Sequence, residues 1–116
     1  MSRYVDMKTE YINSLPQTME PAARIFAALG DPTRQKILLL FEQGEEISIK
    51  TIVELFSFSR TTIVHHLDVL ERAGLITPRR EGKNALYHAN PEILMQALTD
   101  LSNYIREEFY EKNNDR

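Results

Sequence analysis

The sequence predicts a mainly α fold that carries a small β-hairpin. Apolar residues recur at helical spacing through most of the chain, and Gly, Pro or a capping residue separates the segments. Between residues 76 and 88 this spacing gives way to two short strand-like runs around Gly82. A long apolar stripe at helical spacing begins after Pro91. The length of 116 residues suits one domain over 1–116.

The first part of the chain predicts a short extension followed by a helix. Residues 1–18 form the N-terminal extension, in which a weak helical pattern ends at Pro16. Pro21 can begin a clearer helix because its fixed φ suits the first turn. This helix carries Ile25 and Phe26 on one side.

Capping residues mark the helices that follow. Asp31 can cap one helix, and Ser48 and Ser59 can each cap another. Gly74 ends the helix that begins after Ser59. Residues 48–74 therefore predict two helices joined by a tight turn. The expected core face of the second helix comprises Ile63, His66, Leu67 and Leu70.

A basic hairpin follows the second of these helices. The strands are expected over 76–80 and 84–88, with Gly82 at the tip. A helix-turn-helix over 48–74 followed by a wing over 76–88 is a winged helix-turn-helix.

The last helix, expected over residues 91–112, has a wide apolar stripe. This stripe could belong to the protein's own core. Because the domain is small, we expect instead that the first and last helices close a two-fold dimer. The expected interface residues are Ile25, Phe26, Leu94, Leu98, Leu101, Tyr104 and Ile105.

Charge is unevenly distributed along the chain. The net charge is -3, but residues 59–90 carry five basic and three acidic side chains, which gives +2 there and -5 elsewhere. A basic segment on an acidic body suits contact with DNA through that segment. The sequence has no cysteine, which excludes disulfides and thiolate metal sites. It shows no signal peptide or membrane span, so we expect a cytoplasmic protein.

Several strings of residues, taken in order, resemble the ArsR/SmtB family of bacterial repressors. They are Leu29-Gly30-Asp31-Pro32-Thr33-Arg34, SRTTIVHHL over 59–67, LERAGLI over 70–76, RREGK over 79–83 and Leu86-Tyr87. The resemblance spans roughly residues 20–105. It implies a homodimer that binds operator DNA and usually represses transcription. Val64 stands where the family commonly has serine, which removes one expected polar contact.

The residues expected to contact double-stranded DNA lie at the start of the second helix and on the wing. Arginine can bond guanine in the major groove, threonine can touch bases, and wing cations suit the backbone or minor groove. His65 is expected to bond phosphate, whereas His66 is expected to be packed and hydrogen-bonded. The expected DNA-binding residues are Ser59, Arg60, Thr61, Thr62, His65, Arg79, Arg80 and Lys83.

The sequence predicts no metal site, cofactor or catalytic centre. The family's thiolate positions align with Ser48 and Lys50, and its other metal positions align with Pro91, Ile93, Tyr104 and Glu107. Only one of these six residues is a usual zinc ligand. No phosphate-binding glycine loop or nucleophile motif is present. The expected function is therefore a sequence-specific DNA-binding regulator; the alternative is a winged-helix module that docks another protein, which the acidic net charge favours.

Overall fold

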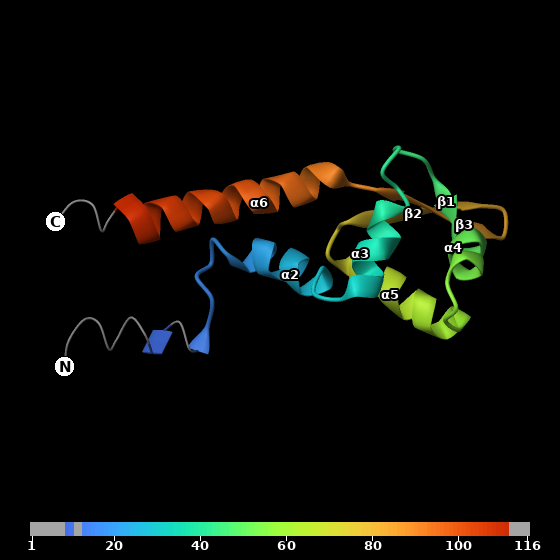
Figure 1. Cartoon of the computed structure of the whole chain (residues 1–116), viewed down its shortest axis with the longest axis horizontal. Helices are drawn as coiled ribbons and strands as arrows, with labels where there is room; N and C mark the ends of the chain where they lie inside the picture. Colours follow the sequence, from blue (N-terminus) through green and yellow to red (C-terminus); the bar gives the residue numbers. More distant parts are fainter. Residues whose placement is uncertain (1–8, 11–12, 112–116) are drawn as a thin grey trace.

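The computed structural model describes residues 9–10 and 13–111, so most of the weak helical pattern expected before Pro16 lies outside the described residues. Figure 1 shows two regions, which we call the head and the stalk. The head contains α3 (Pro32–Leu39), β1 (Ile47–Ser48), α4 (Ile49–Leu55), α5 (Arg60–Arg72), β2 (Ile76–Glu81) and β3 (Asn84–Ala89). The stalk contains α2 (Glu20–Ala28), α6 (Pro91–Ile105) and the π-helical continuation η1 (Arg106–Glu111).

The three expected helix caps are confirmed. The Asp31 carboxylate accepts a 3.1 Å hydrogen bond from the backbone N–H of Arg34. The Ser48 hydroxyl oxygen accepts from the N–H of Thr51 at 3.1 Å, and that of Ser59 accepts from Thr62 at 3.2 Å. Each cap satisfies a donor that the first turn of its helix leaves unpaired.

The expected hairpin is confirmed, and it belongs to a larger sheet than the sequence indicated. Strands β2 and β3 pair antiparallel around Gly82, whose φ of +63° favours glycine at the turn. A third strand, β1, pairs with β3 through Ile47 opposite Tyr87 and Ser48 opposite Leu86. The order is β1-β3-β2. The sequence did not indicate β1, because a two-residue strand is too short to show an alternating pattern.

Large aliphatic side chains form the core of the head. Ile63, Leu67 and Leu70 are at most 1% exposed, which confirms the core face expected for α5. Ile37 and Ile52, from α3 and α4, are 0% exposed. Burial of one such side chain contributes about 1.5–3 kcal/mol, so the packing fixes the orientation of α5 within the head.

The stalk is formed by α2 lying along α6 (Figure 1). Its buried positions carry mostly small side chains, namely Ala22, Ala28 and Ala97, together with Ile25. Ile25 was expected at a dimer interface, but it is 6% exposed in the single chain and therefore belongs to the chain's own core. The remaining expected interface residues keep open surface: Phe26, Leu94, Leu101 and Tyr104 are partly buried, whereas Leu98 and Ile105 are exposed.

Candidate nucleic-acid interface

Helix α5 has a buried face and an exposed face in its first two turns. The Ser59 cap fixes where the helix begins, and Ile63 is buried one turn later. Arg60, Thr61 and His65 are exposed on the other side. These three side chains are therefore available to another molecule.

Ser59 and Thr62 are engaged with each other at the start of α5. The Ser59 hydroxyl donates to Thr62 Oγ1 at 3.0 Å and also accepts from the Thr62 N–H. Thr62 is partly buried. Both residues lie at the start of α5, where DNA contact was expected, but the hydroxyl of Ser59 is already hydrogen-bonded as the cap of the helix.

The two wing arginines have different surroundings, as alternation along a strand requires. The Arg79 guanidinium donates to both carboxylate oxygens of Glu46, with Nε–Oε2 at 2.6 Å and Nη2–Oε1 at 2.8 Å. Its Nη2 also lies 3.0 Å from Glu81 Oε2. The hydrogen bond from Arg79 lowers the pKa of Glu46 and opposes the smaller effect of desolvation. Arg79 therefore holds the wing to the segment before β1.

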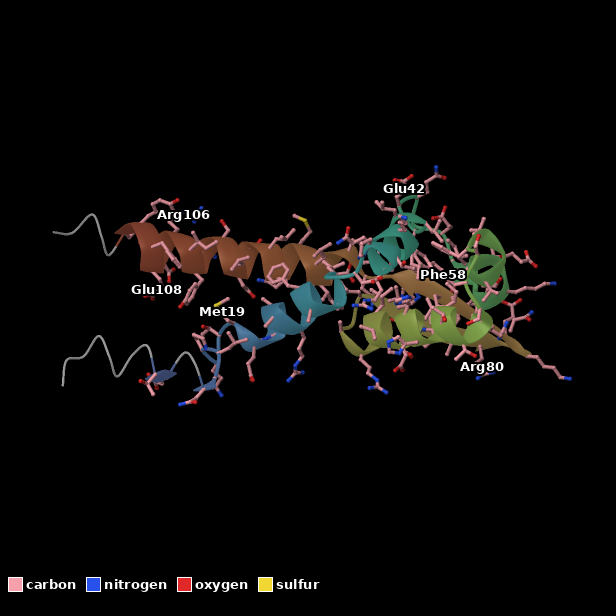
Figure 2. The ribbon with its side chains drawn as sticks, turned by 60° about the horizontal axis from the view of Figure 1, so that its bottom comes forward. Met19, Glu42, Phe58, Arg80, Arg106 and Glu108 are labelled. Atoms are coloured by element: carbon pink, nitrogen blue, oxygen red, sulfur yellow. The ribbon has the colours of Figure 1, made fainter. Side chains whose placement is uncertain are left out.

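Arg80 lies on the other face of the wing. In the view of Figure 2, Arg80 lies at the lower edge of the head, along which α5 also runs. Burial, followed by the charge of Glu71, raises the pKa of the Tyr87 hydroxyl, while Arg80 and Arg60 act in the opposite direction. Arg80 and Arg60 are thus both close enough to Tyr87 to affect its ionisation. Within the described residues, no ion pair involves either arginine.

A hollow of about 220 Å³ lies between α4, α5 and the wing tip. Lys50, Arg60 and Lys83 line it, and each comes from a different element. The sequence reasoning missed Lys50 as a DNA-contact candidate. Lys50 is 33 residues from Lys83, and the pairing of β1 with β3 and the packing of α4 against β3 bring the two segments together.

His66 is packed and hydrogen-bonded, as expected. Its side chain is 13% exposed, and its Nδ1 accepts from Arg34 Nη1 at 3.2 Å. Arg34 also donates from Nε to the carbonyl oxygen of Ala28 at 2.6 Å. This arginine therefore connects the end of α2 to the middle of α5.

Other kinds of site are not evident in the described part of the chain. There, no group of three or more His, Cys, Asp or Glu side chains is placed to hold a metal ion. Across the same residues, every helix is too short or too polar to cross a membrane.

The arrangement defines the class of protein. Helices α4 and α5 are joined by a four-residue turn, the second helix exposes polar side chains, and a hairpin with free cations lies beside it. This is a winged helix-turn-helix of the kind that places its second helix in the major groove of DNA.

Comparisons with known proteins agree with this class and give the family. A family model described as a helix-turn-helix domain matches residues 29–79. The transcriptional repressor SdpR of Bacillus subtilis is 36% identical over 81 residues, which cover 70% of this chain and 89% of the relative. An arsenical resistance operon repressor of Staphylococcus xylosus is 37% identical over 70 residues, covering 60% and 66%. The solved structure of an ArsR-like transcriptional regulator from Rhodococcus superposes with a TM-score of 0.66 at 31% identity, covering 75% and 81%. The chain belongs to the ArsR/SmtB family of transcriptional regulators.

These relatives also bear on the two functions left open by the sequence. They are named as regulators or repressors of transcription, which supports a DNA-binding regulator. The protein-docking alternative finds no support among them. The relatives belong to a class of regulators and not to a class of enzymes.

Proposed function

We propose that two copies of the chain form a homodimer that binds a near-palindromic operator and represses transcription by occluding it. The protein would act in the cytoplasm, with double-stranded DNA as its partner. Each α5 enters a major groove, and the two half-site centres lie about 10 base pairs apart or a multiple of that spacing. The likeness to named repressors supports repression over activation.

The observation that carries the proposal is a convergence of cations beside the exposed face of α5, none of which has an ion-pair partner among the described residues. Lys50, Arg60 and Lys83 line one hollow, and Arg80 and Arg60 both act on the Tyr87 hydroxyl. Phosphate contacts from such cations supply affinity, whereas side chains at the start of α5 read bases. The proposed base-reading residues are Arg60 and Thr61.

The other candidate residues have supporting parts in this proposal. His65 is exposed on α5 and bonds phosphate. Ser59 and Thr62 fix the first turn of α5 through their hydrogen bonds to each other. From that turn they contact the phosphate backbone of the DNA. Arg79 sets the direction of the wing through Glu46, so its contribution to DNA binding is mainly indirect.

The open apolar face of α6 supports the homodimer. On α6, Leu98 is 46% exposed and Ile105 37%, and their spacing of seven residues puts both on one side of the helix. Phe109, in the continuation η1, is 60% exposed. Exposed apolar side chains that recur on one side of a helix indicate a surface that another molecule can cover. A second copy that presents the same face covers both, as two-fold symmetry allows.

A gel-shift assay tests the proposal. The probes are genomic fragments, including the region upstream of the protein's own gene, with random DNA as competitor. We expect one fragment to bind as a complex of two chains, with affinity that falls steeply as salt is raised. Equal affinity for all fragments, or binding that is insensitive to salt, would contradict the proposal.

A further inference from the structure

A pocket of about 520 Å³ lies where the stalk joins the head. Its walls are mainly apolar, with Leu38, Leu39 and Phe41 from α3 and its end, Leu75 before β2, and Leu94 from the first turn of α6. Small-molecule sites in proteins span about 300–1,000 Å³ and are lined in the same way. The pocket can therefore hold a small organic molecule.

Each polar side chain of this pocket has an oxygen that can accept a hydrogen bond. Gln35 uses its amide nitrogen to bond the carbonyl of Leu29 at 2.7 Å, which leaves its amide oxygen available. Asn90 uses its amide nitrogen on Gly74 and Thr77, which leaves its oxygen available as well. We call these two residues and Glu42 the acceptor rim.

The charge of the pocket restricts the class of ligand further. Within the described residues no ion pair involves Glu42, and no Lys, Arg or His lines the pocket. An anionic ligand would meet the exposed carboxylate of Glu42 at the rim with no compensating cation, and this repulsion disfavours it even though water screens part of it. A ligand with an N–H donor or a positive charge would instead complete the acceptor rim.

We propose that this pocket binds a lipophilic amine, and that the bound amine changes the affinity of the protein for its operator. The second half of this statement rests on the proposed function. Figure 2 places Glu42 on the opposite side of the head from Arg80, so a ligand there does not cover the DNA-contact edge. Its effect acts through the angle between head and stalk.

The lining residues explain how this coupling works. Leu75 follows directly on the Gly74 that ends α5, and α3 packs against α5. Leu94 belongs to α6, whose open face closes the proposed dimer. A ligand in the pocket contacts α3, the segment that follows α5, and α6. It therefore favours one angle between head and stalk, and thereby one spacing of the two α5 helices in the dimer.

Binding is tested with two fluorescent probes of the same skeleton. N-Phenylnaphthylamine is apolar and carries an N–H donor, while anilinonaphthalene sulfonate adds a negative charge. Fluorescence titration of the full chain should show one amine probe bound per chain and a sulfonate affinity weaker by about tenfold, or 1.4 kcal/mol. Equal binding of both probes, or binding of neither, would overturn the inference.

Paired variants locate the site. Glu42→Lys should lower the affinity for the uncharged amine probe by about tenfold, because it removes the carboxylate that accepts from the probe's N–H. It should strengthen sulfonate binding, because it replaces a negative charge at the rim with a positive one. Glu45→Lys makes the same change at an exposed residue that does not line the pocket, and should leave both affinities unchanged. If the two variants behave alike, the probe binds elsewhere and the inference fails.

A second pair tests the apolar wall. Leu39 is 65% exposed, so Leu39→Ser should fold, and it should weaken amine binding several-fold. Leu55→Ser is the control, since Leu55 is 60% exposed and lies outside the pocket. An unchanged amine affinity in Leu39→Ser, or an equal loss of amine affinity in Leu55→Ser, would contradict the assignment of the probe to this pocket.

The coupling is measured separately from the binding. Operator affinity is titrated with and without saturating N-phenylnaphthylamine, and a change of at least about threefold is expected in wild type and not in Glu42→Lys. Probe binding without any change in operator affinity would refute the regulatory half. Absence of operator binding in the probe-free titration would instead refute the proposed function, while the fluorescence data would still decide the pocket.

Discussion

The head and the stalk reach burial by different means. In the head, the largest fully buried side chains are all aliphatic and come from α3, α4, α5 and β2. In the stalk, three of the four buried residues are alanines, and larger apolar side chains such as Leu98 and Phe109 remain exposed. The head has a complete core, whereas the stalk resembles half of an interface.

The difference indicates how work is divided between the two regions. The head holds the residues proposed to contact DNA and fixes them by its own packing. The stalk holds the surface proposed to bring two heads together. Specificity for bases should therefore depend on the head, and the gain from two half-sites should depend on the stalk.

The largest effect is expected from a charge on the open face of the stalk. Leu98→Asp places a carboxylate in the apolar seam, where it has no cation to pair with. We expect monomers in sedimentation and a loss of operator affinity of about a hundredfold, because the two half-sites are no longer bound together.

The control for this variant adds the same charge elsewhere on α6. Asn103 is exposed, and its side chain accepts from Arg106 at 3.1 Å, a role that aspartate can keep. Asn103→Asp should remain dimeric and bind the operator normally. A monomeric wild-type protein at micromolar concentration, or a dimeric Leu98→Asp, would break the comparison between stalk and head.

The next effect is expected at the start of the recognition helix. Arg60→Ala should weaken operator binding by about 1–3 kcal/mol if the guanidinium bonds a base, and should weaken binding to random DNA less. Gel shifts with both DNAs measure the difference. Arg24→Ala removes an exposed arginine of the stalk and should change neither affinity. Equal losses on the two DNAs would limit Arg60 to the phosphate backbone.

A smaller effect is expected at the wing tip. Lys83→Ala should weaken binding to all sequences alike and should reduce the slope of log affinity against log salt by about one contact. Arg80→Ala should act in the same way. Lys36→Ala, an exposed lysine of α3 that does not line the hollow, provides the control. An unchanged salt slope in Lys83→Ala would remove this residue from the contact set.

The smallest effect is expected from the pair that holds the wing. The hydrogen bond from Arg79 lowers the pKa of Glu46 from its ordinary value of 4.5. The contribution of the pair to the stability of the fold is therefore complete above pH 4.5 and is lost as pH falls through the lowered pKa. Glu46→Gln at neutral pH should weaken DNA binding only slightly, because exposed pairs contribute little.

Nuclear magnetic resonance can follow this pair directly. In wild type, the Arg79 Nε–H signal should move with a midpoint below 4.5, the ordinary pKa of a glutamate. In Glu46→Gln, the corresponding movement should be absent. A wild-type midpoint at or above the ordinary value would show that the pair does not persist in solution.

Features of the head set by neighbouring residues could be predicted from the sequence. The caps at Asp31, Ser48 and Ser59 depend on residues only three positions apart. The hairpin turn depends on Gly82. The buried face of α5 follows from helical spacing, since residues three or four positions apart lie on the same side of a helix.

Features that depend on distant segments could not be predicted. The Arg79–Glu46 pair joins residues 33 positions apart, and no local pattern marks it. Lys50 joins the cationic hollow because β1 adds to the sheet and α4 packs against β3. Ile25 has the spacing of a stripe residue, but periodicity does not distinguish a face that packs within the chain from one that packs against a second copy.

The small side chains along the stalk also link the protein's stability to its abundance. Ala22, Ala28 and Ala97 contribute little burial, so a second copy would add apolar contact to α6 that the single chain lacks. By mass action, the folded fraction of the stalk then rises with total chain concentration. The concentration of folded dimer would then rise more steeply than the total concentration of the chain. Dilution of the chain during growth would lower the dimer concentration in the same steep way. A gene controlled by such a protein would respond to a threshold in copy number even without an effector.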